Sequence, residues 1–256
     1  MQWAVIFKKE MVEYARNVKW IWVPMVFLLF GIMDQITTYY LPKILESVGG
    51  MPEGAELNIP IPDPPAALYM SISEFNMLGV MVIALISMGL IAGELKSGVY
   101  ELVLSKPVKY SNYITAKWAG LSLLVLSSVF LGYLGGWYYV NILYGELAFS
   151  TFIVSFLIYT MYILFFITIS VFVNTLVKNP GLVLFLSIAL LIAITIITRI
   201  FGHILSWSPG HLSSYVNEYL HTGTMTGDMW ATMATTLAII VLLLFTAVTI
   251  LKNKEL

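Results

Sequence analysis

The sequence predicts an all-α membrane protein that crosses the bilayer six times. Its composition is the first reason: 59% of the 256 residues are hydrophobic and only 11% are charged, whereas soluble domains carry about 25% charged residues. The second reason is that six separate apolar stretches each reach the roughly 20 residues that a spanning helix needs. These stretches are expected to be helical, because unpaired backbone groups are too costly in lipid.

The predicted spans form one membrane domain over residues 1–256, with no linker long enough to separate a second domain. Residues 1–19 precede the first span, and their apolar side chains recur at steps of three or four. This pattern favours an amphipathic interfacial helix along the membrane surface over a solvated charged leader. The spans are expected at about residues 20–40, 75–93, 118–143, 152–177, 181–201 and 229–251.

The lysines and arginines indicate how the spans are oriented. Eleven of the 13 fall at the two ends of the chain or in the second-to-third and fourth-to-fifth connections. Only Lys43 and Arg199 fall on the other side. Since positive residues stay on the cytoplasmic side, both termini are expected in the cytoplasm. No small-x-small cleavage site follows the first apolar run, so this run is predicted to remain as a span.

The outer connections differ in character. The first, at about residues 41–74, has a proline-rich middle that is expected to be extended, and its residues 66–74 allow a short helix that leads into the second span. In the last, at 202–228, Ser208 and Pro209 provide a cap and a first helical turn, and Gly223 is a stop signal. An apolar stripe lies between them, so a helix along the outer membrane face is expected.

Several function classes are excluded or disfavoured. The chain has no cysteine, which rules out disulfides and thiolate metal sites, and its net charge of −1 gives no basic surface for nucleic acid. The motifs of zinc proteases and serine hydrolases are missing. Gly93 and Gly98 have the glycine spacing of a phosphate-binding loop, but Val99 and Tyr100 stand where that loop needs its lysine and hydroxyl residue. We therefore expect no catalytic residue, metal site or cofactor in this chain.

Isolated polar residues give weaker hypotheses. Arg199 and Asn141, near the outer ends of spans, are candidates for a substrate path. Contact with lipid headgroups and hydrogen bonds between helices are the simpler explanations. The three histidines, His203, His211 and His221, are interpreted as interfacial residues of the last outer connection rather than metal ligands.

Small residues are spaced for close helix packing in two places. These are Gly89-x-x-x-Gly93 in the second span and Gly132-x-x-x-Gly136 in the third. Such spacing lets two helix backbones approach each other. It predicts either packing within one subunit or contact between two subunits.

The connection between the second and third spans carries the most specific pattern. An acidic residue follows the second span, and then come Gly-x-x-Glu-Leu-x-Leu-Ser-x-Pro-Val and a downstream lysine. This segment resembles the membrane subunits of ABC-2-type ATP-binding-cassette transporters. The matching positions are Glu94, Gly98, Glu101, Leu102, Leu104, Ser105, Pro107, Val108 and Lys117. Two departures are Val99 in place of the family's threonine or serine, and Lys109 one place before the family's basic residue.

The resemblance implies that this connection is a cytoplasmic coupling helix that docks on an ATPase. Taken alone, the residues allow a short helix from Ser97 to Leu104 ended by Pro107, or a plain solvated connector. The ATPase-coupling residues that it implies are Glu94, Ser97, Gly98, Glu101, Leu102, Leu104, Ser105, Lys106 and Pro107.

The resemblance also implies partners. A separate ATPase in two copies would bind ATP and Mg²⁺, and a second permease subunit, identical or related, would complete the path in the cell membrane of a prokaryote. Export of an amphipathic, peptide-like or lipid-like substrate is expected, because the family exports more often than it imports and the spans hold few charges. The alternatives are an ion- or proton-coupled carrier, a membrane enzyme, and an accessory or sensor subunit without transport.

Overall fold

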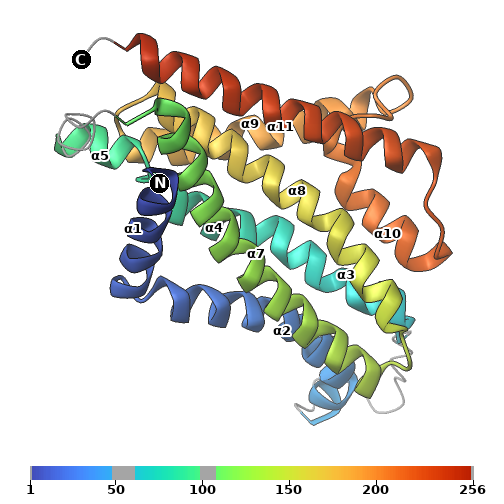
Figure 1. The fold of residues 1–256 in the computed structure, drawn as a ribbon. Helices are drawn as coiled ribbons and strands as arrows, with labels where there is room; N and C mark the ends of the chain where they lie inside the picture. Colours follow the sequence, from blue (N-terminus) through green and yellow to red (C-terminus); the bar gives the residue numbers. More distant parts are fainter. Residues whose placement is uncertain (1, 48–60, 99–107, 255–256) are drawn as a thin grey trace.

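The protein was analysed as a computed structural model that describes residues 2–47, 61–98 and 108–254. In these ranges it is helical and free of strands, and six of its helices are long and apolar enough to cross a membrane (Figure 1). The predicted fold class is therefore confirmed. The spanning helices are α2 (Lys19–Ser47), α3 (Pro64–Glu74) continued by η1 (Phe75–Gly79) and α4 (Val80–Ser87), α7 (Tyr110–Leu143), α8 (Phe149–Leu176), α9 (Pro180–Ile200) and α11 (Gly227–Asn253).

Two spans begin earlier than the apolar pattern predicts. The second begins at Pro64 rather than at residue 75, because the Asp63 side chain caps the helix by accepting a hydrogen bond from Ala66 N (3.3 Å). The third begins at Tyr110 rather than at residue 118, and its added turns pack against α1 (Gln2–Arg16). Polar residues in these turns, such as Glu74 and Lys117, lower the local hydropathy, so the continuous apolar pattern begins only after them.

The first helix, α1, lies at the end of the bundle where the two termini are found and packs against α7 (Figure 1). Helix α1 meets α2 at a sharp elbow where Val18 has φ +57° (Figure 1). This conformation is strained for a β-branched residue. The elbow separates α1 from α2 and lets α1 turn its buried face, with Ile6 and Tyr14, toward α7.

Helices α7 and α8 form the centre of the bundle. Helix α2 packs along α7, and α11 packs along α8. In the apolar windows of α2, α9 and α11 only 22% of the residues are buried, compared with 56% in α7 and 61% in α8. Because the uncovered side chains are largely apolar, these outer helices are suited to contact lipid or another subunit.

Close backbone packing joins α2 to α7. A Cβ atom placed on Gly31 would lie 2.0 Å from the Gly132 carbonyl oxygen, and one placed on Gly136 would lie 2.7 Å from the Gly31 carbonyl oxygen. The second small-residue motif thus makes the predicted close approach inside one subunit. The first does not, since Gly89 and Gly93 have no atom of the described chain within 4 Å of a Cβ placed on them.

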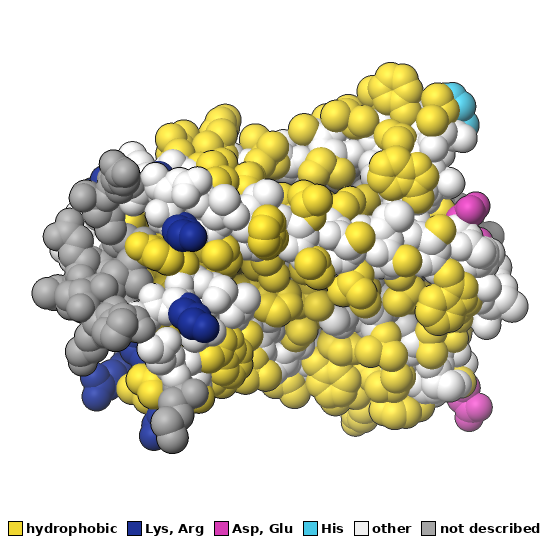
Figure 2. Space-filling view, turned by 45° about the horizontal axis from the view of Figure 1, so that its top comes forward, with side chains coloured by type: hydrophobic (Ala, Val, Ile, Leu, Met, Phe, Trp, Pro, Cys, Tyr) yellow, Lys and Arg dark blue, Asp and Glu magenta, His cyan; other side chains and the backbone are white. Residues whose placement is uncertain are grey.

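The two ends of the bundle differ in charge. Both termini lie at one end, which we call the terminal face, and the connections 61–63, 144–148 and 201–226 lie at the other end, the opposite face (Figure 1). Figure 2 shows lysine and arginine gathered at the terminal end, a broad apolar belt, and acidic and histidine side chains at the other end. A belt between two polar ends is the surface expected of a bilayer-spanning bundle.

The last connection of the opposite face contains the expected helix. The Ser208 side chain accepts a hydrogen bond from Gly210 N (3.4 Å) at the start of η2 (Pro209–His211), which leads into α10 (Leu212–Thr222). Gly223 ends α10 in the left-handed region, at φ +66°. Helix α10 packs against α8 and α3, so it closes one side of the opposite face.

Candidate functional site

A buried ion-pair cluster joins three helices at the terminal face. Lys117 of α7 lies with its Nζ atom 2.7 Å from Oε1 of Glu10 in α1 and 3.0 Å from Oε1 of Glu94 in α5 (Ala92–Ser97). Glu10 and Lys117 are each only 1% exposed. Because an isolated buried charge is very costly, the ion pairs between these side chains offset the cost of burying them.

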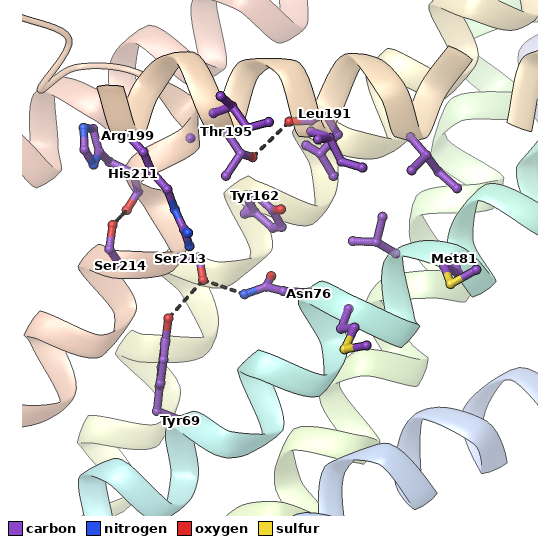
Figure 3. Close-up of a pocket in the computed structure, with 16 residues that line it drawn as sticks. Tyr69, Asn76, Met81, Tyr162, Leu191, Thr195, Arg199, His211, Ser213 and Ser214 are labelled. Atoms are coloured by element: carbon purple, nitrogen blue, oxygen red, sulfur yellow. Dashed lines mark hydrogen bonds between the residues drawn. The ribbon is translucent and has the colours of Figure 1, made fainter. Parts of the chain in front are cut away.

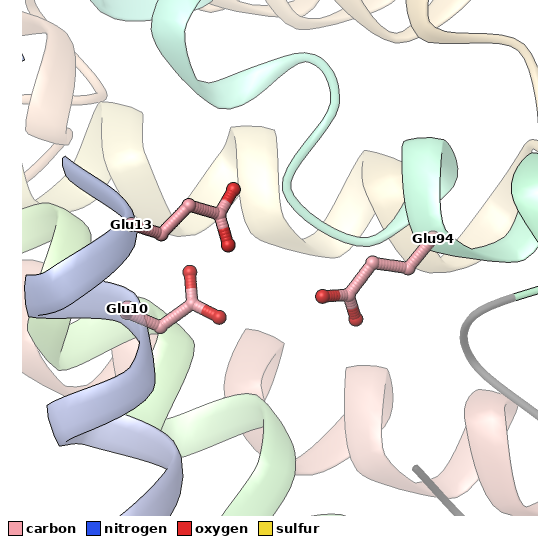
Figure 4. A group of neighbouring side chains, drawn as sticks. All are labelled: Glu10, Glu13 and Glu94. Carbon is pink, nitrogen blue, oxygen red and sulfur yellow. The ribbon is translucent and has the colours of Figure 1, made fainter. Parts of the chain in front are cut away.

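Two further residues complete the charge cluster. Lys9 forms an ion pair and hydrogen bond with Glu94, and the Tyr113 hydroxyl donates a hydrogen bond to the second carboxylate oxygen of Glu94. Figure 4 shows the carboxylates of Glu10, Glu13 and Glu94 converging from α1 and α5. Their spacing would suit a metal ion, but the ammonium groups of Lys9 and Lys117 already lie among them and balance their charge. The absence of a metal site therefore stays our prediction.

The surroundings of the cluster raise the pKa values of Lys9 and Tyr14 in α1. Burial acts to lower the pKa of Lys9, but the hydrogen bond to Glu94 and the nearby carboxylates outweigh it and raise that pKa above its usual value. Burial, followed by the charges of Glu10 and Glu13, raises the pKa of the Tyr14 hydroxyl well above its usual value. Both shifts favour the protonated forms, which are the charged amine of Lys9 and the neutral hydroxyl of Tyr14.

The sequence contained a signal for Glu10 that the apolar pattern concealed. Glu10 follows Phe7 by three residues and precedes Tyr14 by four, so it lies on the apolar face of α1. A search for apolar periodicity passes over an acidic residue on such a face. An unmatched charge there indicates a buried partner, which the structure shows to be Lys117.

A side-chain amide fixes the break that precedes α5. Helix α4 ends at Ser87, and Asn174 of α8 accepts hydrogen bonds from Ile91 N and Ala92 N, both at 3.1 Å. Its Nδ2 atom donates to the carbonyl oxygens of Ser87 (3.0 Å) and Ser170 (2.9 Å). One buried asparagine thus satisfies the backbone groups that the break exposes, and it fixes the start of α5 relative to α8.

The predicted coupling residues fall partly within the structure. Glu94 and Ser97 belong to α5, and Gly98 ends it with φ +74°. The others lie outside the described residues: Glu101, Leu102, Leu104, Ser105, Lys106 and Pro107. In the sequence, residues 99–107 therefore connect α5, which contains Glu94, with α7, which contains Lys117.

The two candidate path residues lie in different surroundings. Arg199, in the last turn of α9, lines a cavity of about 500 Å³ on the opposite face (Figure 3). Asn141 is not among the residues that line it. Its amide donates to the Trp137 carbonyl oxygen (2.8 Å) and accepts from Leu147 N (2.9 Å), so it supports the turn between α7 and α8.

The charge cluster links the two helices that precede and follow residues 99–107. The segment 99–107 is bounded by α5 and α7, and the lysine and carboxylates of the cluster tie both helices to α1. The ion pairs therefore join α1, α5 and α7 at one point. Buried ion pairs resist separation, since breaking one leaves an uncompensated charge.

Comparison with known proteins gives two relationships. The sequence profile of a family described as ABC-2 family transporter protein matches residues 4–256. An uncharacterized transmembrane protein of Bacillus subtilis (strain 168), YxlG, is 28% identical over 218 residues, which cover 85% of this chain and 84% of that protein. The profile match extends over nearly the whole chain, so it includes the charge cluster and the cavity.

Proposed function

Because this chain belongs to the ABC-2 family of transporter proteins, we propose that it is the membrane subunit of an ATP-driven exporter. The family and the six apolar helices make it a multi-pass membrane protein of a transporter. A separate ATP-binding-cassette ATPase supplies the energy in this proposal, and it docks on the segment 99–107. The terminal face, with its lysines and arginines, is then cytoplasmic.

One observation carries the proposal: the buried charge cluster ties both ends of the segment 99–107 to α1. A plain solvated connector would not need Glu94 on one side and Lys117 on the other to share a buried ion-pair network. Such a network is suited to a connection that a bound ATPase displaces. A force applied to the segment moves α5 and α7 as one unit with the interfacial helix α1.

The mechanism follows from this linkage. Two ATPase copies bind ATP and Mg²⁺ between them, and their closure displaces the segment 99–107 on each of two permease subunits. The charge cluster carries the displacement into α7, and the close contact of Gly31 with Gly132 carries it into α2. Two arrangements of the helices then alternate, each favoured by a different nucleotide state. The subunits meet through exposed apolar helix faces in the cell membrane of a prokaryote.

The apolar character of the bundle interior favours an amphiphilic substrate. The central helices α7 and α8 are lined mainly by apolar and aromatic side chains. The described cavity combines an apolar wall with a few polar groups. A small inorganic ion would require a denser set of charged or carbonyl ligands, so we propose an amphipathic, peptide-like or lipid-like substrate.

Purification from native membranes tests the ATPase partner. The tagged chain, extracted in mild detergent, is expected to retain an ATP-binding-cassette ATPase in about equal amount by mass spectrometry. The double variant Glu101→Ala, Leu102→Ala should lose it, because these residues lie within the proposed docking segment. Glu218→Ala, an exposed change in α10 on the opposite face, should retain it.

The proposal fails if the folded, abundant wild-type chain brings no ATPase with it. It also fails if the double variant and Glu218→Ala retain the ATPase equally, since docking would then lie elsewhere.

A further inference from the structure

The cavity on the opposite face lies between helices that are distant in sequence. It is bounded by η1 and α4 of the second span, by α9, by the start of α10 and by Tyr162 of α8. Its volume of about 500 Å³ falls within the usual range of small-molecule sites. The π-helical turn at Phe75–Gly79 places Asn76 on the cavity wall, and such turns occur frequently at functional sites.

One end of the cavity is polar and held in place by hydrogen bonds. Tyr159 donates to Oδ1 of Asn76 (3.1 Å), and Nδ2 of Asn76 donates to the Ser213 hydroxyl (2.6 Å). The Tyr69 hydroxyl lies 3.4 Å from the same oxygen of Ser213. Because Ser213 accepts from Asn76, its own proton can be donated to Tyr69 or to a bound ligand (Figure 3).

A single permanent charge stands at this polar end. The side chain of Arg199 extends from α9 toward Ser213 (Figure 3). No aspartate or glutamate lines the cavity, and across residues 2–47, 61–98 and 108–254 no hydrogen bond or salt bridge holds the guanidinium. Its donors are therefore available to an anion, and a guanidinium is shaped to bind a phosphate or carboxylate through two parallel hydrogen bonds.

The other side of the cavity is apolar and open toward the lipid-facing surface. Met77 is 70% exposed, and Met81 and Ile192 are each 52% exposed, although all three line the cavity. Methionine side chains are flexible and adapt to ligands of different shape. An alkyl chain can thus enter sideways from the bilayer while its head group lies against Arg199.

We propose that this cavity binds an amphiphile with one anionic head group and an apolar tail. The Arg199 guanidinium and the Ser213 hydroxyl hold the head group, and the wall of Met77, Met81 and Ile192 holds the tail. As the cargo site of the exporter, the assignment rests on the function proposed above. As a binding site, it can be tested without an ATPase.

The cysteine-free chain makes a direct binding assay simple. Thr195 lines the cavity, and within the described ranges its hydroxyl bonds only the Leu191 carbonyl oxygen of its own helix (2.9 Å), so Thr195→Cys introduces one thiol with little disturbance. The variant is placed in zwitterionic lipid nanodiscs, and the rate of maleimide labelling is measured while dodecyl phosphate is added. Phe185→Cys is the matched control, since it is exposed on the same helix outside the cavity.

Dodecyl phosphate is expected to slow labelling at Thr195→Cys and to leave Phe185→Cys unchanged. Dodecanol, which lacks the charge, and inorganic phosphate, which lacks the tail, should each protect far less. With Arg199→Gln the half-protecting concentration should rise about tenfold or more, because a charge-assisted hydrogen bond is lost. Arg199→Lys, which keeps the charge, should recover part of the protection.

The assignment is overturned if dodecanol protects as well as dodecyl phosphate, if inorganic phosphate alone protects fully, or if Arg199→Gln leaves the half-protecting concentration unchanged. Unaltered labelling of Phe185→Cys in the Arg199→Gln chain confirms that this variant is folded. A negative result in this binding assay would not change whether an ATPase copurifies with the chain. The two proposals can therefore fail separately.

Discussion

Replacing Lys117 by methionine is expected to lower the free energy of unfolding by about 3–5 kcal/mol, the usual cost of removing one partner from a buried ion pair. Lys117 is 1% exposed and lies within 3.0 Å of carboxylate oxygens of both Glu10 and Glu94. Methionine fills a similar volume but leaves these two carboxylates buried with less compensation. Denaturant titration of the purified chain in detergent measures the loss.

Two variants make the Lys117 result specific. Lys8→Met removes an exposed lysine of α1 that forms no salt bridge within the described ranges, so it should change stability by only about 0.5 kcal/mol or less. Adding Glu10→Gln to Lys117→Met should recover part of the loss, since residues of one network are energetically coupled. Equal stability of Lys8→Met and Lys117→Met would show that the charge cluster does not hold α1, α5 and α7 together.

Substituting alanine for Gly132 is the second change with a large expected effect. Its Cβ atom would lie 2.2 Å from the Phe27 carbonyl oxygen, and that atom belongs to the backbone of α2 and cannot rotate away. Helices α2 and α7 must therefore separate, at a cost of about 1–3 kcal/mol or more. Thermal unfolding in detergent, followed by circular dichroism, should show a lower midpoint.

Gly93→Ala is the matched control for Gly132→Ala. This glycine is also in a helix and in a small-residue motif, but no atom of the described chain lies within 4 Å of the added Cβ. Because alanine reduces the entropy of the unfolded chain, stability should stay the same or rise by about 0.4–1 kcal/mol. A Gly132→Ala chain as stable as Gly93→Ala would rule out the close contact between α2 and α7.

The sequence was sufficient to predict the helix bundle because apolar stretches of spanning length can be recognised directly in it. Long apolar stretches must be helices in lipid, and the limits of α10 could be read from Ser208, Pro209 and Gly223, whose caps and backbone preferences are local. The apolar pattern placed the starts of two spans only at residues 75 and 118, because polar residues such as Glu74 and Lys117 lie in the turns before them. Their stability depends on Asp63 and on packing against α1.

The candidate sites were less predictable because their partners are far apart in the chain. Lys117 was known as a motif position, but Glu10 lies 107 positions before it and was not singled out from the sequence. Arg199 was recognised from its place at the end of a span. The polar groups that face it in the cavity, Asn76 and Ser213, come together only through tertiary structure, 137 positions apart.

A cross-link from position 97 tests most directly whether an ATPase docks beside α5. Ser97→Cys introduces one exposed thiol next to the segment 99–107 in a chain that has no other cysteine, and Thr224→Cys places the same thiol on the exposed connection of the opposite face. Each is labelled with a photoactivatable maleimide in native membranes, and the adducts are identified by mass spectrometry. An ATP-binding-cassette ATPase attached at position 97 and missing at position 224 is the predicted result. No ATPase adduct at position 97, with equal labelling of both thiols, would contradict a motor docked at this face.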